Sequence, residues 1–354
     1  MKSNYKSIGE LVERIDQRNT DGTLTNLIGV SIDKRFIPSV ANVIGTDLTK
    51  YKVIEKYDFA VSLMQVSRDE KIPVACQTDF DKAIMSPAYP IFRVKDTNVI
   101  LPEYLEMWFM RPEFDREASF IAVGGVRGSM PWDDFANMKL PVPSIMEQHE
   151  IVSGYKAITE RIKLKKQIND NLEATALAIY KETFITQNSS DWSKGTLSDL
   201  LTVKYGKDHK HLADGSIPLY GSGGIMRYVE KALYDKVSVL IPRKGTLSNV
   251  IYVDEPFWSV DTMFYTEIAK PYAAKFIYYF VKSKDLAGMD TGSAVPSMSS
   301  EIIHSMQLSI PDDDTLISFD NRLCPLYKQI KANNQECAKL KDLQDVLLTT
   351  ILSR

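Results

Sequence analysis

Two stretches of the sequence decide the fold: GGVRGSMPWDDFANMKLPVP at residues 124–143, and GSAVPSMSSEIIHSMQLSIP at residues 292–311. Aligned without a gap, they match at six positions. The matched pairs, all offset by 168 residues, are Gly124/Gly292, Ser129/Ser297, Met130/Met298, Met138/Met306, Leu140/Leu308 and Pro143/Pro311. Because this offset is close to half of the 354-residue chain, the sequence predicts one unit used twice, a pseudo-two-fold internal repeat.

A long helix is predicted after each copy of this stretch. Apolar residues there recur mostly three or four positions apart, which places them on one stripe of a helix. They are Ile151, Tyr155, Ile158, Ile162, Ile168, Leu172, Ala176 and Ile179 in the first copy, and Ile317, Leu323, Tyr327, Ile330, Cys337, Leu340, Leu343, Leu347 and Ile351 in the second. The narrow stripe predicts that the two helices pair as an antiparallel coiled coil. The alternative is that each helix packs only on its own domain. Pro325 is expected to kink or break the second helix near its start.

The regions before the helices carry short β-rich runs divided by turn residues. The predicted strands are 61–66 and 91–94 in the first half and lie within 235–245, 249–253 and 263–268 in the second; Pro102–Met110 and Pro271–Lys284 are predicted helices, and Tyr220–Gly224 a loop. The fold class is therefore α+β. We predict globular domains at residues 1–143 and 189–311, each followed by a long helix, at 144–188 and 312–354.

Composition limits the class of protein. The chain has 43 basic and 46 acidic residues, a net charge of -3, and 44% hydrophobic residues, which is ordinary for a globular protein. Its three cysteines form no CxxC pair, as is typical of a reducing compartment. No apolar run approaches the roughly 20 residues of a membrane span. We expect a cytoplasmic protein with no membrane partner.

An ordered set of motifs carries a resemblance to a known family. The motifs are LPVPSIMEQHE at 140–150, IPLYGSGGI at 217–225, VLIPRKGTLSNV at 239–250 and FWSVDT at 257–262. Together they resemble the specificity subunit of Type I restriction–modification systems. The first half departs from the pattern, with MQVSR at 64–68 and SPAY at 86–89 in place of the Gly-rich and Pro-Arg-Lys-Gly motifs. The second helix lacks the Glu147-Gln148 pair of the first.

The resemblance implies a function in DNA recognition. Each globular part would be a target recognition domain that reads one half of a bipartite, asymmetric site in double-stranded DNA. The two helices would set the spacer between the half-sites and dock two methylation subunits. Restriction subunits would complete the complex. S-adenosylmethionine, ATP and Mg are then expected on the partner subunits, and no cofactor in this chain.

The chain itself lacks the motifs of the obvious enzymes. It has no Pro-Pro tetrapeptide of the amino-methyltransferases, no Walker loop and no GxSxG elbow. His209 and His211 match no zinc-ligand spacing, and Asp312–Asp314 is better placed to cap a helix than to bind a metal. We therefore predict a non-catalytic subunit. The alternatives are a stand-alone DNA-modifying enzyme and a coiled-coil scaffold that binds only protein.

Contacts to DNA need cationic or amide side chains on protruding elements. The candidates are Arg68, Lys71 and Arg127 in the first domain and Lys207, Lys210, Arg243 and Lys244 in the second, with Tyr220 as a backbone or stacking contact. Trp132, Trp192 and Trp258 are predicted to lie in the cores. Because the net charge is slightly negative, the isolated chain is expected to bind DNA weakly and to rely on the methylation subunits for electrostatic grip.

Overall fold

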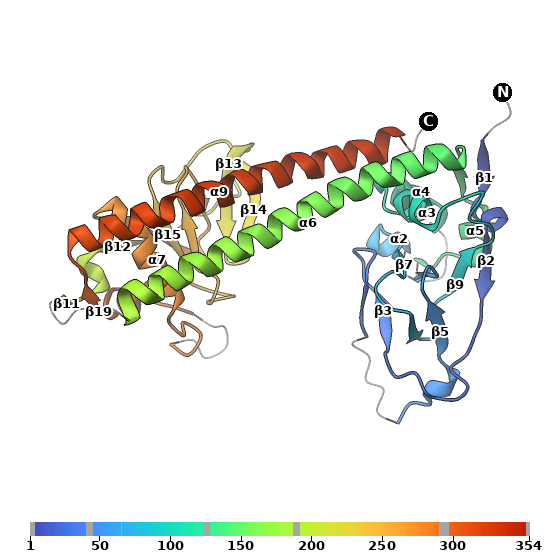
Figure 1. The fold of residues 1–354 in the computed structure, drawn as a ribbon, viewed down its shortest axis with the longest axis horizontal. Helices are drawn as coiled ribbons and strands as arrows, with labels where there is room; N and C mark the ends of the chain where they lie inside the picture. Colours follow the sequence, from blue (N-terminus) through green and yellow to red (C-terminus); the bar gives the residue numbers. More distant parts are fainter. Residues whose placement is uncertain are drawn as a thin grey trace. The chain divides into compact units, whose positions relative to one another are not determined.

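The computed structural model describes residues 4–39, 45–64, 66–123, 128–186, 192–289 and 297–351. The chain divides into two compact units (Figure 1). Unit 1 comprises Met1–Leu164 and Glu336–Arg354, and unit 2 comprises Lys165–Gln335. Each unit therefore holds one globular part together with a portion of both long helices. No described helix is long and apolar enough to cross a membrane.

Unit 1 is built on a four-stranded antiparallel sheet. Its strand order is β2 (Val12–Ile15), β9 (Ile91–Val94), β6 (Phe59–Val61) and β7 (Val74–Cys76). The helices α3 (Pro102–Phe109), α4 (Pro112–Ile121) and α5 (Trp132–Asn137) join this sheet in one core of aromatic rings. A second apolar cluster forms between the strand pairs β3 (Ile28–Val30) with β4 (Phe36–Pro38) and β5 (Lys52–Glu55) with β8 (Lys82–Met85).

Unit 2 repeats the four-stranded sheet in the same order. Its strands are β12 (Leu201–Tyr205), β18 (Met263–Ile268), β15 (Ser238–Pro242) and β16 (Ile251–Val253), with α7 (Ala274–Lys282) packed in the same core. Unit 2 adds a three-stranded sheet in the order β14 (Gly224–Val229), β13 (Asp214–Gly221) and β17 (Trp258–Ser259). The segment 220–224, predicted as a loop, is therefore the tip of the β13–β14 hairpin.

The repeated stretches 124–143 and 292–311 pair with the first strand of their units in the same way. In unit 1, β10 (Lys139–Pro141) pairs with the N-terminal strand β1 (Tyr5–Ser7), so that Lys139 lies opposite Ser7. In unit 2, β19 (Gln307–Ile310) pairs with β11 (Ser193–Thr196), so that Gln307 lies opposite Thr196. A capping box follows each first strand, at Ser7 with Glu10 and at Thr196 with Asp199. The internal repeat is confirmed, and it extends to the start of each domain.

The two long helices are α6 (Ile145–Lys181) and α9 (Asp313–Val346), and each ends in a short π-helical segment. As the residue number increases along α6, the number of the residue that it contacts on α9 decreases. In unit 1 Thr159 contacts Gln344 and Arg161 contacts Glu336; in unit 2 Asn169 contacts Asn333 and Glu182 contacts Arg322. The predicted antiparallel pairing is confirmed.

Packing on the globular parts accompanies this pairing. Val152 of α6 and Leu348 beyond α9 are buried in the core of unit 1. Tyr180 of α6 and Leu323 of α9 are buried in the core of unit 2. The alternative in which each helix packs only on its own domain is therefore wrong, because each also contributes to the other core.

The structure corrects two local predictions. Pro325 does not break the second helix: it lies inside α9, which continues past it because Leu323 and Leu326 pack on the core of unit 2 to either side of the proline. The kink at Pro325 stays a prediction. Residues 61–66 are not one strand: β6 ends at Val61, and Val66 begins the short helix α2 (Val66–Asp69). The chain leaves the sheet there because Val66 is needed in the core, where it is fully buried.

Candidate nucleic-acid interface

The candidate residues of unit 2 gather at one edge of its main sheet. Because β18 runs antiparallel to β12 and β15, its start lies beside the ends of both strands. Lys207 follows β12, and its amide donates to the Ser259 carbonyl at 2.9 Å. Arg243 follows β15, and its amide donates to the Thr262 carbonyl at 2.8 Å. This edge, made of 205–210, 243–245 and 259–262, is called the basic edge below.

Arg243 is the most restrained cation at the basic edge. Its guanidinium carbon lies 5.3 Å from the ring centre of Tyr205, a cation–π contact. Its Nη1 donates to the Asp261 carbonyl at 3.2 Å. The Tyr205 ring is itself held edge-on against Phe264, with centroids 5.0 Å apart. The next residue, Lys244, is exposed and has no such support from its side chain in the described residues.

The tip of the β13–β14 hairpin is fastened to the basic edge. The Val260 amide of the edge donates to the Tyr220 carbonyl at 3.0 Å, and Asn249 Nδ2, just beyond the edge, donates to the Ser222 carbonyl at 2.8 Å. Gly245 has φ +84, and a Cβ there would lie 2.8 Å from Ser222 Oγ, so only glycine fits without strain. Between tip and edge lies a groove of about 390 Å³, lined by His209, Gly221, Ser222, Gly223, Met226, Val260, Asp261 and Thr262. The lining mixes apolar side chains, Met226 and Val260, with polar ones such as His209 and Thr262.

Tyr220 does not belong to this surface. Its ring is only 8% exposed and packs edge-on against Phe257. Burial raises the pKa of the Tyr220 hydroxyl to about 12. Its carbonyl accepts a hydrogen bond from the Val260 amide at 3.0 Å. The predicted stacking contact is wrong because the ring is needed in the core of the three-stranded sheet, whereas the alternative, a backbone contact, stays a prediction.

The hairpin presents a surface that the sequence did not reveal. Strand β14 is an edge strand, and Ile225, Met226 and Tyr228 on it are each about half exposed. Between them, Arg227 is held by Asp214 and by the carbonyls of His209 and Leu212. Lys210 is exposed in the turn that these bonds fix. Residues 224–229 read GIMRYV, without alternation of apolar and polar residues, so the sequence carried no clear signal for this surface.

The candidates of unit 1 are less concentrated. Arg68 lies on α2 and pairs with the neighbouring Asp69 at 3.0 Å. Lys71 is exposed just after α2. Arg127 lies outside the described residues. The structure therefore brings Arg68 and Lys71 to one short segment and does not place the third candidate.

Equivalent hydrogen bonds in the two units show which residue of unit 1 corresponds to Arg243. The Met298 amide donates to the Arg243 carbonyl at 2.9 Å, and the repeat-related Met130 amide donates to Leu63 at 2.8 Å. Residues 62–64 thus take the place of the Pro-Arg-Lys-Gly motif. The segment 86–89 precedes β9, as 257–262 precedes β18. The structure therefore corrects both predicted placements, that of 64–68 at the Gly-rich motif and that of 86–89 at the Pro-Arg-Lys-Gly motif.

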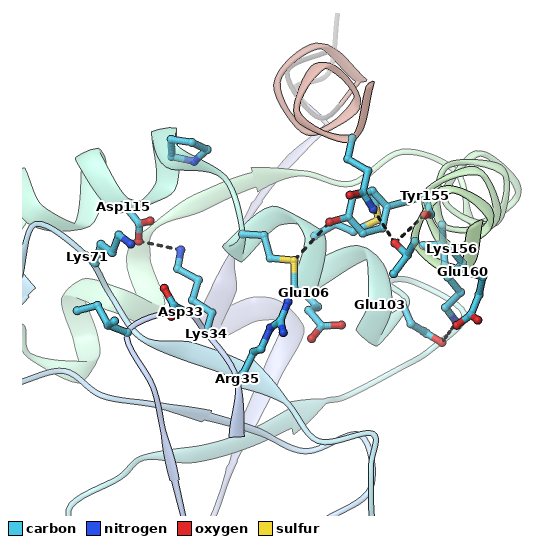
Figure 2. A pocket seen from close by; sticks show the side chains of 17 residues that line it. Asp33, Lys34, Arg35, Lys71, Glu103, Glu106, Asp115, Tyr155, Lys156 and Glu160 are labelled. Carbon is cyan, nitrogen blue, oxygen red and sulfur yellow. Dashed lines mark hydrogen bonds and ion pairs between the residues drawn. The ribbon is translucent and has the colours of Figure 1, made fainter. Parts of the chain in front are cut away.

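Unit 1 also contains a cavity of about 610 Å³, seen in Figure 2. Its charged side chains largely satisfy one another. Lys34 lies 2.8 Å from Asp115, and Lys156 lies 2.9 Å from Glu103. Burial raises the pKa of the Glu106 carboxyl to about 7. These pairs tie the β3–β4 turn and α6 to the helices α3 and α4, which is a structural role.

The structure places several side chains that the sequence singled out. In the part of the chain that the structure describes, no three or more His, Cys, Asp or Glu side chains are grouped to hold a metal ion. Burial raises the pKa of the Cys76 thiol, so it is neutral at physiological pH. Asp312 accepts from the Thr315 amide at 2.8 Å, so it caps α9 as predicted. Trp258 is buried, and Trp132 and Trp192 pack against the cores.

Comparison with known proteins gives a family match on both halves. The model of the Type I restriction modification DNA specificity domain matches residues 66–174 and again residues 189–341. The two matches cover most of the chain and follow the two halves of the internal repeat.

Three similar proteins illustrate the match. The specificity subunit of the Type I restriction enzyme HindI from Haemophilus influenzae is 22% identical over 205 residues, 56% of this chain and 44% of that subunit. The specificity subunit of MjaIX from Methanocaldococcus jannaschii is 22% identical over 300 residues, 72% of this chain and 68% of that one. The crystal structure of a Type I restriction–modification S subunit from M. genitalium has a TM-score of 0.61 at 16% identity, over 99% of this chain and 96% of that one. The aligned region thus spans less than half of the HindI subunit.

Proposed function

The chain belongs to the Type I restriction–modification DNA specificity family, and from this premise we propose that it is a non-catalytic subunit that recognises a DNA sequence. Each globular part reads one half of a bipartite, asymmetric site. The observation that carries the proposal is the basic edge of unit 2, where Lys207, Arg243 and Lys244 meet a fastened hairpin tip. Cations on protruding turns suit the phosphates and base edges of duplex DNA.

The repeat supports the division into half-sites. Both units use the same four-stranded sheet, with strand ends and following turns at the same edge. The turns themselves differ, as Leu63 replaces Arg243. Two units that share a scaffold but differ in their turns are suited to recognise two half-sites of different sequence. In this proposal Arg68, Lys71 and Arg127 serve the first half-site, and Lys207, Lys210, Arg243 and Lys244 serve the second.

The paired helices have a separate task in the proposal. They set the spacer between the half-sites and dock two methylation subunits, to which restriction subunits are added. S-adenosylmethionine, ATP and Mg are bound by those partner subunits. The net charge of -3 supports this division, because a chain with more acidic than basic residues gains little affinity for DNA phosphates from its overall charge.

Footprinting of the chain assembled with its methylation subunits tests the proposal. We expect protection of two short segments of fixed sequence on one duplex, and no specific protection by the methylation subunits alone. Protection without sequence preference would indicate a scaffold that binds only protein. Methyl transfer by the purified chain alone would indicate an enzyme. Either result would refute the proposal.

A further inference from the structure

We propose that Arg243 reads a guanine in the half-site of unit 2 and that Tyr205 is the residue that positions it. This inference rests on the proposed function and names the contact that gives it sequence preference. Neither the family match nor the motifs assign a role to Tyr205. The evidence is the geometry of the guanidinium, the support of the tyrosine ring, and the difference between the repeated units.

The guanidinium of Arg243 is fixed on two sides. The guanidinium carbon lies over the Tyr205 ring, 5.3 Å from the ring centre. Its Nη1 is bound to the Asp261 carbonyl at 3.2 Å. No described residue accepts a hydrogen bond from Nε or Nη2. One edge of the guanidinium is thus held, and a second edge is available to a ligand.

Tyr205 is built to support this orientation. Its ring lies edge-on against the fully buried Phe264, and its hydroxyl lies 3.3 Å from Ser300 Oγ. The ring is nevertheless 51% exposed. An aromatic side chain that is fixed at two points but half open to solvent is suited to hold a charged neighbour rather than to fill the core.

A fixed guanidinium edge suits a base better than a phosphate. Two parallel N–H groups match the O6 and N7 acceptors of guanine in the major groove, the commonest specific contact of arginine with DNA. A phosphate accepts from many directions, and the neighbouring Lys244, exposed and without support, meets that need. Arg243 and Lys244 thus divide base reading and backbone contact between them.

The first unit lacks both members of the pair. Leu63 occupies the position of Arg243, as the matched bonds from Met130 and Met298 show. Asp16 occupies the position of Tyr205. In unit 1 Ile15 pairs with Ile91, in unit 2 Lys204 pairs with Tyr265 at the matching place, and Asp16 and Tyr205 are the residues that follow. Asp16 is bound to Arg18 at 2.7 Å instead. The guanine contact therefore belongs to one half-site only.

The test uses the complex of the chain with its methylation subunits and a duplex carrying its methylated motif. Each guanine of the motif is replaced in turn by 7-deazaguanine, which lacks the N7 acceptor. We expect one position in one half-site where this change lowers the affinity of the unaltered complex about tenfold. At that position Arg243→Met, which has no donor for O6 or N7, should lower the affinity for the normal site similarly and remove the effect of the analogue.

Three variants separate reading from positioning. Tyr205→Phe keeps the ring and should keep the preference at that position, whereas Tyr205→Leu should relax it there and nowhere else. Lys244→Gln, the control, should weaken binding to all sequences and lower the salt dependence by about one phosphate contact. Two results would overturn the inference: a motif left unchanged by Arg243→Met, or a Tyr205→Leu variant that behaves like Lys244→Gln. Absence of any motif for the unaltered complex would instead refute the proposed function.

Discussion

Replacing Asn333 with leucine should destabilise the helix pair far more than replacing Asn169 and Asn333 together. Asn333 is 1% exposed and Asn169 is 8% exposed, so both amides are buried between α6 and α9 within unit 2. Asn333 Nδ2 donates to Asn169 Oδ1 at 2.8 Å, and Asn333 Oδ1 accepts from Lys165 Nζ at 3.0 Å and from Gln329 at 2.9 Å. Buried polar groups of this kind define the register of paired helices.

The magnitude follows from what each change leaves unpaired. Asn333→Leu removes three hydrogen bonds and leaves the buried Asn169 oxygen without its partner, which should cost about 2–4 kcal/mol. The double change removes both buried amides. The donors and acceptor that it releases can reach water, because Gln329 and Asn334 are exposed and Lys165 is partly exposed. The cost of the double change should be below about 1 kcal/mol, because replacing both partners of a buried bond by apolar groups is nearly neutral.

Hydrogen exchange of the purified chain measures this locally. Peptides from residues 165–175 and 325–335 should lose protection in the single variant and regain it in the double variant. Asn171→Leu, the same substitution on an exposed position of α6, should change stability by less than about 0.5 kcal/mol. A double variant at least as unstable as the sum of the two single variants would show that the amides are not coupled, and would refute the reasoning.

Three further predictions concern the units themselves. Arg243→Ala combined with Lys244→Ala should weaken specific DNA binding by the assembled complex, and unchanged binding and site choice would exclude the basic edge. Because burial raises the pKa of Glu106 to about 7, unfolding should become easier as pH rises from about 4.5 to 7, and Glu106→Gln should remove up to about 3 kcal/mol of that dependence in urea titrations; a parallel pH profile would contradict this. Gly245→Ala should cost about 1–3 kcal/mol in thermal unfolding, whereas Gly223→Ala, with open space at its Cβ, should cost less; equal effects would refute the argument from φ.

Much of the fold could be predicted from the sequence because the repeat preserves spacing in the helices. The 168-residue offset aligns Met138 with Met306 and Leu140 with Leu308, and these pairs occupy matching places in the two units. The match between Ser7 and Thr196 was missed because unit 1 carries a longer segment between its first strand and the quoted stretch. An alignment without gaps does not detect it.

The reading surface was harder to predict, for physical reasons. Tyr220 lies in a Gly-rich motif that suggests exposure, but a parallel pairing of β13 with β17 buries its ring. Tyr205 was not singled out, because its contact with Arg243 joins residues far apart in the sequence through two strand ends. Charge and turn composition identified the cationic residues of unit 2. Contacts between strands that are distant in the sequence determine which of these side chains is held in one orientation.

Methylome sequencing of a host with and without this gene tests the central claim most directly. If each unit reads one half-site, the host should carry one adenine-methylated motif with two specified segments separated by unspecified bases, and deletion of the gene should abolish it. A gene that restores the motif only when both units are intact would agree with the account. A continuous motif, or a bipartite one that survives deletion, would contradict it.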